Sequence, residues 1–163
     1  MKNTWATFAT LAVIGAIGLG VTVAAVGATD DQAASYLITA TMTAKQVVQP
    51  RPVGKVDKAR GSLIGKATLA TRSQVAWTLT YSGMTGRVVS TLVLFKNAKG
   101  VSTAISLCVT PCKSGLKSFT FFRSRGEGEY FVKQVLADKV EVILRTKRNP
   151  KGEIRGVLRA RKV

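Results

Sequence analysis

From residue 36 onward the chain alternates apolar and polar positions with a period of two, the spacing of a β-strand that buries one face. β-Branched and aromatic residues dominate these segments, and glycine-containing turns separate them. In the clearest segment, 74–81, one face carries Val75, Trp77, Leu79 and Tyr81. The pattern predicts strands at residues 36–43, 61–71, 74–81, 88–95, 101–107, 118–122, 139–146 and 153–161.

Two segments lack this alternation. Residues 123–128 combine arginine with glycine and are predicted to form a flexible basic loop. Residues 131–138 are compatible with a short helical turn, and no long amphipathic helix is predicted. Seven or eight strands at this spacing predict an all-β fold, namely an antiparallel β-sandwich or barrel.

The N-terminal segment has a different pattern. Residues 5–28 carry no charge, follow a single lysine at position 2, and end in the small-residue sequence Val26-Gly27-Ala28. This layout predicts a secretory signal peptide at residues 1–28, and the alternative is an uncleaved hydrophobic anchor. No cysteine lies nearby, which excludes a lipoprotein anchor. The predicted organisation is therefore a signal helix, a short tether at 29–35 and one β domain at 36–163, in a secreted or cell-surface protein.

The charge of the predicted mature chain is extreme. One of the 25 basic residues leaves with residues 1–28, so 24 basic residues face 8 acidic ones, a net charge of +16. Such a charge favours attraction to polyanions, which outside a cell include anionic lipids and envelope polymers. The alternative is that the charge serves only solubility. Five cations are predicted to stand in exposed loops and turns: Arg123, Arg125, Lys147, Arg148 and Lys151.

The residue inventory argues against catalysis. Cys108 and Cys112 are the only cysteines, and in an exported chain this spacing predicts a disulfide, the alternative being a redox-active pair. The chain has no histidine to serve as a general base or metal ligand. Glu127 lies in the predicted flexible loop and Glu129 directly follows it, and such a segment is a poor support for paired glycosidase carboxylates. We expect no catalytic residue, no metal site and no cofactor.

The most specific motif lies near the C-terminus. Asn149-Pro150 is predicted to open a turn, Gly152 to close it with a positive φ, and the flanking strands to pair as a hairpin. Alternation after the turn predicts Glu153 and Arg155 on one side of a strand and Ile154 on the other. Glu153 and Arg155 are then expected to form partly buried ion pairs that fix the hairpin, either with each other or with neighbouring strands. A role in ligand binding is the alternative.

The segment Asn149-Pro150-Lys151-Gly152-Glu153-Ile154-Arg155-Gly156 resembles the closing signature of the chordin-type repeat (CHRD) family. Weaker similarity extends over the segment 75–86 and the stretch 46–50. The resemblance implies an immunoglobulin-like β fold and an exported, extracellular module. Many relatives carry histidines where this chain has Ser90 to Phe95 and Leu144-Arg145-Thr146, so any role of those histidines does not transfer.

Aromatic residues cluster before the predicted basic loop. Phe119, Phe121 and Phe122 cannot all face inward, because positions 121 and 122 point to opposite faces of a strand. An exposed phenylalanine beside Arg123 and Arg125 has two interpretations. It packs locally at an edge, or it stacks on a base or enters a membrane interface.

These observations predict a non-catalytic extracellular or cell-surface module that binds anionic envelope polymers or membrane lipids through weak electrostatic contacts. A nucleic-acid-binding basic protein is one alternative, although no base-reading motif is present and no specific nucleic acid is expected. A membrane-anchored surface module that retains its N-terminal helix is the other.

Overall fold

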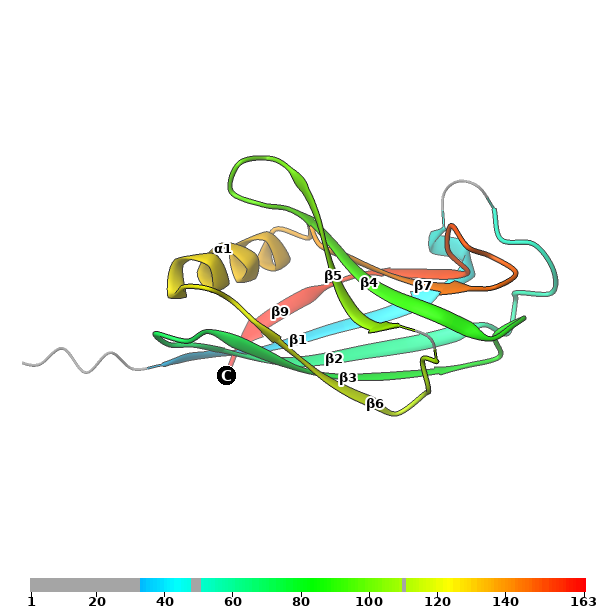
Figure 1. Ribbon diagram of the computed structural model, residues 1–163, viewed down its shortest axis with the longest axis horizontal. Helices are drawn as coiled ribbons and strands as arrows, with labels where there is room; N and C mark the ends of the chain where they lie inside the picture. Colours follow the sequence, from blue (N-terminus) through cyan, green and yellow to red (C-terminus); the bar gives the residue numbers. More distant parts are fainter. Residues whose placement is uncertain (1–32, 48–50, 110) are drawn as a thin grey trace, which may run out of the picture. The chain divides into compact units, whose positions relative to one another are not determined.

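A computed structural model describes residues 33–47, 51–109 and 111–163 of the 163-residue chain (Figure 1). The predicted signal peptide, 1–28, and most of the predicted tether lie outside the described residues. Residues 31–163 form one compact unit. Every side chain of its hydrophobic core belongs to the range from Ile38 to Leu158, so this unit contains its own core and can be studied without residues 1–30.

The described part of the chain is predominantly antiparallel β-structure, as the alternation predicts. The strands are β1 (Ala34–Thr43), β2 (Arg60–Leu69), β3 (Gln74–Ser82), β4 (Val88–Lys96), β5 (Ser102–Val109), β6 (Leu116–Phe121), β7 (Glu141–Thr146), β8 (Ile154–Val157) and β9 (Arg159–Lys162). A short 3-10 helix, Ala44–Gln46, follows β1. The first strand begins two residues earlier than predicted and so takes in the end of the predicted tether.

The strands form one sheet that curls almost into a barrel. Its order is β5-β4-β7-β8-β1-β2-β3-β6, and β9 pairs with β1 beside β8. The two ends of this order, β5 and β6, are not paired with each other among the described residues. Figure 1 shows the result as two layers, with β4, β5 and β7 over β1, β2, β3 and β6.

The core lies between these layers and follows the predicted alternation. Val75, Trp77 and Leu79 of β3 are almost fully buried, while Tyr81 is partly buried at the end of the strand. Gly65 of β2 lies directly opposite Trp77, and a Cβ there would approach the Trp77 ring to 2.5 Å. The indole therefore occupies the space that a side chain at position 65 would need.

One element departs from the prediction. Residues Arg125–Leu136 form a twelve-residue helix, α1, where a flexible loop and a short helical turn were expected. Ser124 caps its N-terminus by accepting a hydrogen bond from the Glu127 amide at 3.2 Å. Gly128 fits against the turn before β3, because a Cβ there would lie 2.5 Å from Cβ of Ser73. The glycine that suggested a loop thus permits close packing of a helix.

The cysteines form the predicted disulfide between the end of β5 and the segment leading to β6. The Cα atoms of Cys108 and Cys112 are 5.7 Å apart, which is within ordinary bridging range. Nearby, the hydroxyl of Tyr81 donates to the carbonyl of Cys112 at 2.7 Å. The bridge therefore closes a short loop at the end of β5, four residues before β6 begins.

A buried hydroxyl in β4 leads to a stability prediction. Thr91 is fully buried, and its Oγ1 has no hydrogen-bond partner among the described residues. Because an unpaired buried polar atom is unfavourable, Thr91→Val is expected to raise the free energy of unfolding by about 1 kcal/mol. Urea denaturation measures this change, with Thr39→Val on the exposed side of β1 as the matched control. A less stable Thr91→Val protein would show that the hydroxyl has a partner.

Candidate functional site

The candidate site is built around the closing turn between β7 and β8. The two strands pair in register, with Glu141 opposite Val157 and Leu144 opposite Ile154, which confirms the predicted hairpin. Gly152 has φ of 134°, and its amide donates to the carbonyl of Asn149 at 3.1 Å. Gly152 therefore closes the turn with the positive φ that the sequence predicted.

Glu153 is placed differently from the prediction. Alternation put it on the side of Arg155, but its side chain is fully buried. Oε2 accepts hydrogen bonds from the hydroxyls of Thr146 (2.6 Å) and Thr85 (2.8 Å) and from Nδ2 of Asn149 (3.0 Å). Oε1 accepts from the Thr85 amide at 2.5 Å. Strand β8 begins only at Ile154, so Glu153 still belongs to the turn. The alternation of side chains along β8 therefore does not determine which way the Glu153 side chain points.

Glu153 and Arg155 therefore do not pair with each other, and of the two only Arg155 forms the expected ion pair with a neighbouring strand. Nη1 of Arg155 lies 3.5 Å from the carboxylate of Glu141 on the neighbouring strand, and Glu153 is held by neutral donors. Burial by itself would raise the pKa of Glu153. The hydrogen bonds from Thr146, Asn149 and Thr85 outweigh that effect and hold the pKa below its ordinary value. The group is a structural carboxylate that remains charged.

Asn149 extends this network to a distant loop. Its Oδ1 accepts the amide of Val53 at 2.6 Å, and its Nδ2 donates to the Val53 carbonyl at 3.3 Å. These bonds join segments that are 96 residues apart in the chain. The Asn149 side chain also donates to the Glu153 carboxylate. The buried carboxylate therefore orients Asn149, and Asn149 holds the loop that carries Arg51 and Pro52 against the closing turn.

The two joined segments surround a cleft of about 180 Å³. Its walls carry three exposed cations, Arg51, Arg148 and Lys151, and no acidic residue. Gly54 leaves room for Arg148, since a Cβ there would lie 3.3 Å from Cζ of the guanidinium. We call Arg51, Arg148 and Lys151 the closing-turn cluster. Lys147, the remaining predicted cation of this turn, is also exposed but does not line the cleft.

Arg123 and Arg125 lie elsewhere, at the start of α1. Figure 1 places that helix at one end of the unit and the turn between β7 and β8 at the other. Nε of Arg125 is 2.8 Å from Glu129, and the backbone amide of Arg123 donates to Glu127 at 2.9 Å. The Arg123 side chain lines a hollow of about 480 Å³ that also contains Glu127. Carboxylates beside both arginines make this end less suited to anions than the closing-turn cluster.

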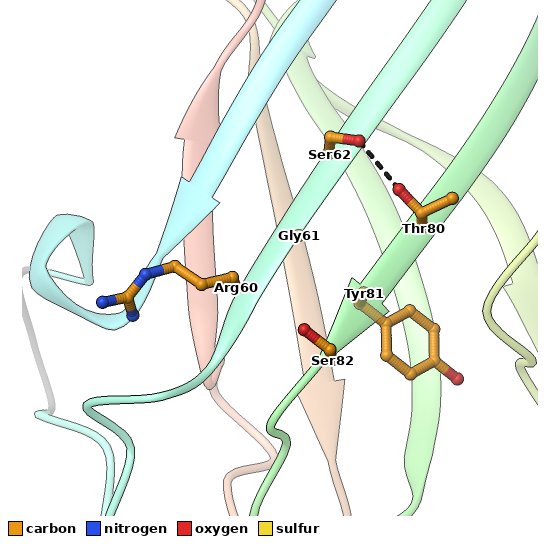
Figure 2. A pocket seen from close by; sticks show the side chains of 6 residues that line it. All are labelled: Arg60, Gly61, Ser62, Thr80, Tyr81 and Ser82. Carbon is orange, nitrogen blue, oxygen red and sulfur yellow. Dashed lines mark hydrogen bonds between the residues drawn. The ribbon is translucent and has the colours of Figure 1, made fainter.

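A third hollow, of about 400 Å³, lies over the ends of β2 and β3 and is lined by Arg60, Gly61, Ser62, Thr80, Tyr81 and Ser82 (Figure 2). The Ser62 and Thr80 hydroxyls share a hydrogen bond of 2.8 Å. Arg60 points away from them and donates to the Ala59 carbonyl. Burial raises the pKa of Tyr81. No carboxylate lines this hollow.

Glu127 and Glu129, the carboxylates weighed as a glycosidase pair, are each engaged at the start of α1, with the Arg123 amide and with Arg125 respectively. Within residues 33–47, 51–109 and 111–163, no group of three histidine, cysteine or acidic side chains is placed to hold a metal ion. No helix in this part of the chain is both long and apolar enough to cross a bilayer.

Comparisons of this chain with family models, with curated proteins and with solved structures found no match. The resemblance to the CHRD family therefore stays a prediction that rests on the closing motif.

Sequence reasoning missed Arg51. The sequence shows an exposed, proline-rich loop there, and nothing local indicates that it meets the closing turn. The contact is made by the Asn149 side chain with a residue 96 positions away in the chain. The periodicity of apolar and polar residues does not reveal contacts at that separation. The one local sign of this contact is Asn149 itself, because an asparagine side chain can accept from and donate to the backbone of another segment at the same time.

Proposed function

We propose that this protein is an exported, non-catalytic extracellular or cell-surface module that binds anionic envelope polymers through the closing-turn cluster. The observation that carries the proposal is the cleft in which Arg51, from one loop, meets Arg148 and Lys151, from another. The bonds of Asn149 to Val53 hold the two loops together before any ligand arrives. Cations positioned in advance lose less entropy on binding than cations on separate mobile loops.

The chemistry of the cluster suits phosphate or sulfate groups. Guanidinium groups present several N–H donors in a fixed plane, which matches the oxygens of such anions, and Lys151 adds a compact charge. The net charge of +16 on residues 29–163 adds long-range attraction. A cleft of about 180 Å³ accommodates one repeating anionic group of a polymer at a time. Selectivity among polyanions is therefore expected to be low.

The test uses residues 31–163 and three polyanions: a poly(glycerol phosphate) of the teichoic-acid type, heparin and duplex DNA. Affinity is measured over a salt series for the wild type and for the triple variant Arg51→Gln, Arg148→Gln, Lys151→Gln. Each neutralised phosphate releases counterions, so the triple variant is expected to flatten the salt slope by about 2 to 3 and to weaken binding at low salt by more than tenfold.

The matched control removes three exposed lysines away from the closing turn, in Lys99→Gln, Lys133→Gln, Lys139→Gln, so that both triple variants have the same net charge. If both variants lose affinity equally, binding is diffuse and the cluster is not the site. If the wild type binds none of the polyanions at low salt, the proposed function is wrong. Preference for one DNA sequence would replace the proposal with the nucleic-acid alternative.

A further inference from the structure

A second surface lies on the outer side of the layer formed by β9, β1, β2, β3 and β6. Figure 1 shows no other described element on the side of this layer that faces away from β4, β5 and α1. The five strands contain no aspartate or glutamate. This face is therefore open, and its own strands place no negative charge on it.

Strand pairing aligns its side chains in rows. One row runs Arg161, Leu37, Lys66, Ala76, Phe119, from β9 across to β6. The next runs Arg159, Thr39, Ile64, Thr78, Lys117. At about 4.8 Å between strands, each row spans roughly 19 Å. Cations, apolar groups and threonines thus share one broad face, which we call the outer face.

The apolar groups of the outer face are unusually exposed. Phe119 is 60% exposed and Phe121 is 70% exposed, and their rings stack with centroids 6.4 Å apart. Ile64, two strands away, is 49% exposed. Phe122 points inward and packs against Phe131, as the predicted opposition of positions 121 and 122 requires. Two large aromatic side chains on the end strand β6 therefore stay largely exposed to solvent and do not pack in the core.

The cations of the outer face lie at different distances from these rings: Lys117 is on the same strand, Lys66 is two strands away and Arg161 is at the far end of the row. Lys66, Lys117 and Arg161 are all exposed. Arg159 has a carboxylate nearby: an oxygen of Asp138 lies 3.7 Å from its Nε. Lysine and arginine next to exposed aromatic rings are typical of surfaces that lie at a membrane interface, with rings among the acyl chains and cations among the phosphates.

We propose that the outer face docks on an anionic lipid bilayer. Phe119 and Phe121 enter the boundary between headgroups and acyl chains, and Lys66, Lys117 and Arg161 contact lipid phosphates. The lack of acidic residues in its five strands suits a negatively charged partner. This inference is independent of the closing-turn cluster, which uses other residues and takes a soluble polymer.

The first test measures partition of residues 31–163 onto vesicles of phosphatidylcholine with or without phosphatidylglycerol. The wild type is expected to bind the anionic vesicles and not the neutral ones. Phe119→Ser with Phe121→Ser is expected to lower the partition coefficient by about tenfold or more, and high salt then removes the remaining binding. The control, Val101→Ser with Val109→Ser, changes two side chains that are 57% and 73% exposed on and beside β5. It is expected to bind like the wild type.

The second test reports insertion directly. Phe121→Trp places an indole on the outer face, while Trp77 stays buried and gives a constant background. Lipids brominated on the acyl chain are expected to quench the new indole in Phe121→Trp and not in Val101→Trp. An unquenched Phe121→Trp, or equal losses in the phenylalanine and valine pairs, would overturn the proposal. A dimer that dissociates in the phenylalanine double variant, without vesicle binding, would assign the face to a second copy of the chain.

Binding of polymers by the closing-turn cluster and binding of lipids by the outer face can be tested separately. The variant Arg51→Gln, Arg148→Gln, Lys151→Gln is expected to lose polymer binding and to retain quenching of the indole in a Phe121→Trp background. The phenylalanine double variant is expected to bind anionic vesicles about tenfold or more less tightly and to retain its affinity for poly(glycerol phosphate). Loss of both activities in either variant would mean that one surface serves both ligands, and the inference of a separate lipid face would be wrong.

Discussion

Replacing Glu153 with glutamine is expected to lower the free energy of unfolding by about 2–4 kcal/mol. The Glu153 carboxylate acts only as an acceptor. It accepts hydrogen bonds from the amide and hydroxyl of Thr85, the hydroxyl of Thr146 and Nδ2 of Asn149. A carboxylate accepts from all of them, whereas a glutamine amide turns one of its two ends into a donor. In either orientation, donors then face one another in a site that water does not reach.

Urea denaturation of residues 31–163 measures this loss, and Glu129→Gln is the matched control. Glu129 makes an exposed ion pair with Arg125 on α1, so removing its charge is expected to change stability by less than about 1 kcal/mol. Equal stability of Glu153→Gln and the wild type would mean that the network tolerates a neutral partner, and the assigned role of the charge would be wrong.

The same variant probes the link between the buried carboxylate and the closing-turn cluster. Glu153→Gln adds one unit to the net charge, which by itself would strengthen binding to polyanions. It also loosens Asn149, which holds the loop that carries Arg51. Weaker binding to poly(glycerol phosphate), despite the more positive charge, is the expected result. Stronger binding would show that charge alone decides.

The pH dependence of Glu153 follows from its depressed pKa. Because the pKa is lower in the folded protein than in the unfolded chain, the carboxylate contributes stability above its unfolded-state pKa. That contribution is lost as the pH falls through the folded-state pKa. The stability difference between the wild type and Glu153→Gln should therefore shrink as the solution is acidified.

The sequence predicted what depends on local alternation. The strand faces around Trp77, the hairpin closed by Gly152 and the Cys108–Cys112 bridge all follow from spacings of a few residues, and all are present. Glu153 was misplaced because strand parity was extended into a turn. Its burial depends on Thr85, which is 68 residues away and comes from another loop.

The helix was missed for a similar reason. Gly126 and Gly128, among arginines and glutamates, have the composition of a loop, and glycine is a poor helix former. The helix exists because of tertiary packing, since Gly128 admits close contact with Ser73, and Phe131 and Val135 enter the core. Arg51 escaped prediction because only the folded chain brings it to the closing turn.

Replacing Phe131 with alanine is expected to reduce the free energy of unfolding by about 3–5 kcal/mol. Phe131 is fully buried at the centre of an aromatic cluster. Its ring lies 5.2 Å from that of Phe122, 5.3 Å from that of Phe95 and 6.3 Å from that of Trp77, measured between centroids. These partners come from both layers, so truncation leaves a cavity where α1 joins them and also removes favourable edge-to-face contacts.

Urea denaturation measures the global effect, and hydrogen exchange of the α1 amides shows whether the helix detaches before the sheet unfolds. The matched control, Tyr130→Phe, keeps an aromatic ring on the neighbouring residue and removes only a hydroxyl that donates to the Asn97 carbonyl at 3.1 Å. It is expected to reduce stability by about 1 kcal/mol. A loss in Phe131→Ala no larger than in this control would mean that α1 packs on the sheet without depending on the aromatic cluster. Loss of hydrogen-exchange protection in α1 alone, with β3 and β4 still protected, would instead show that the helix unfolds locally while the barrel-like sheet keeps its own core.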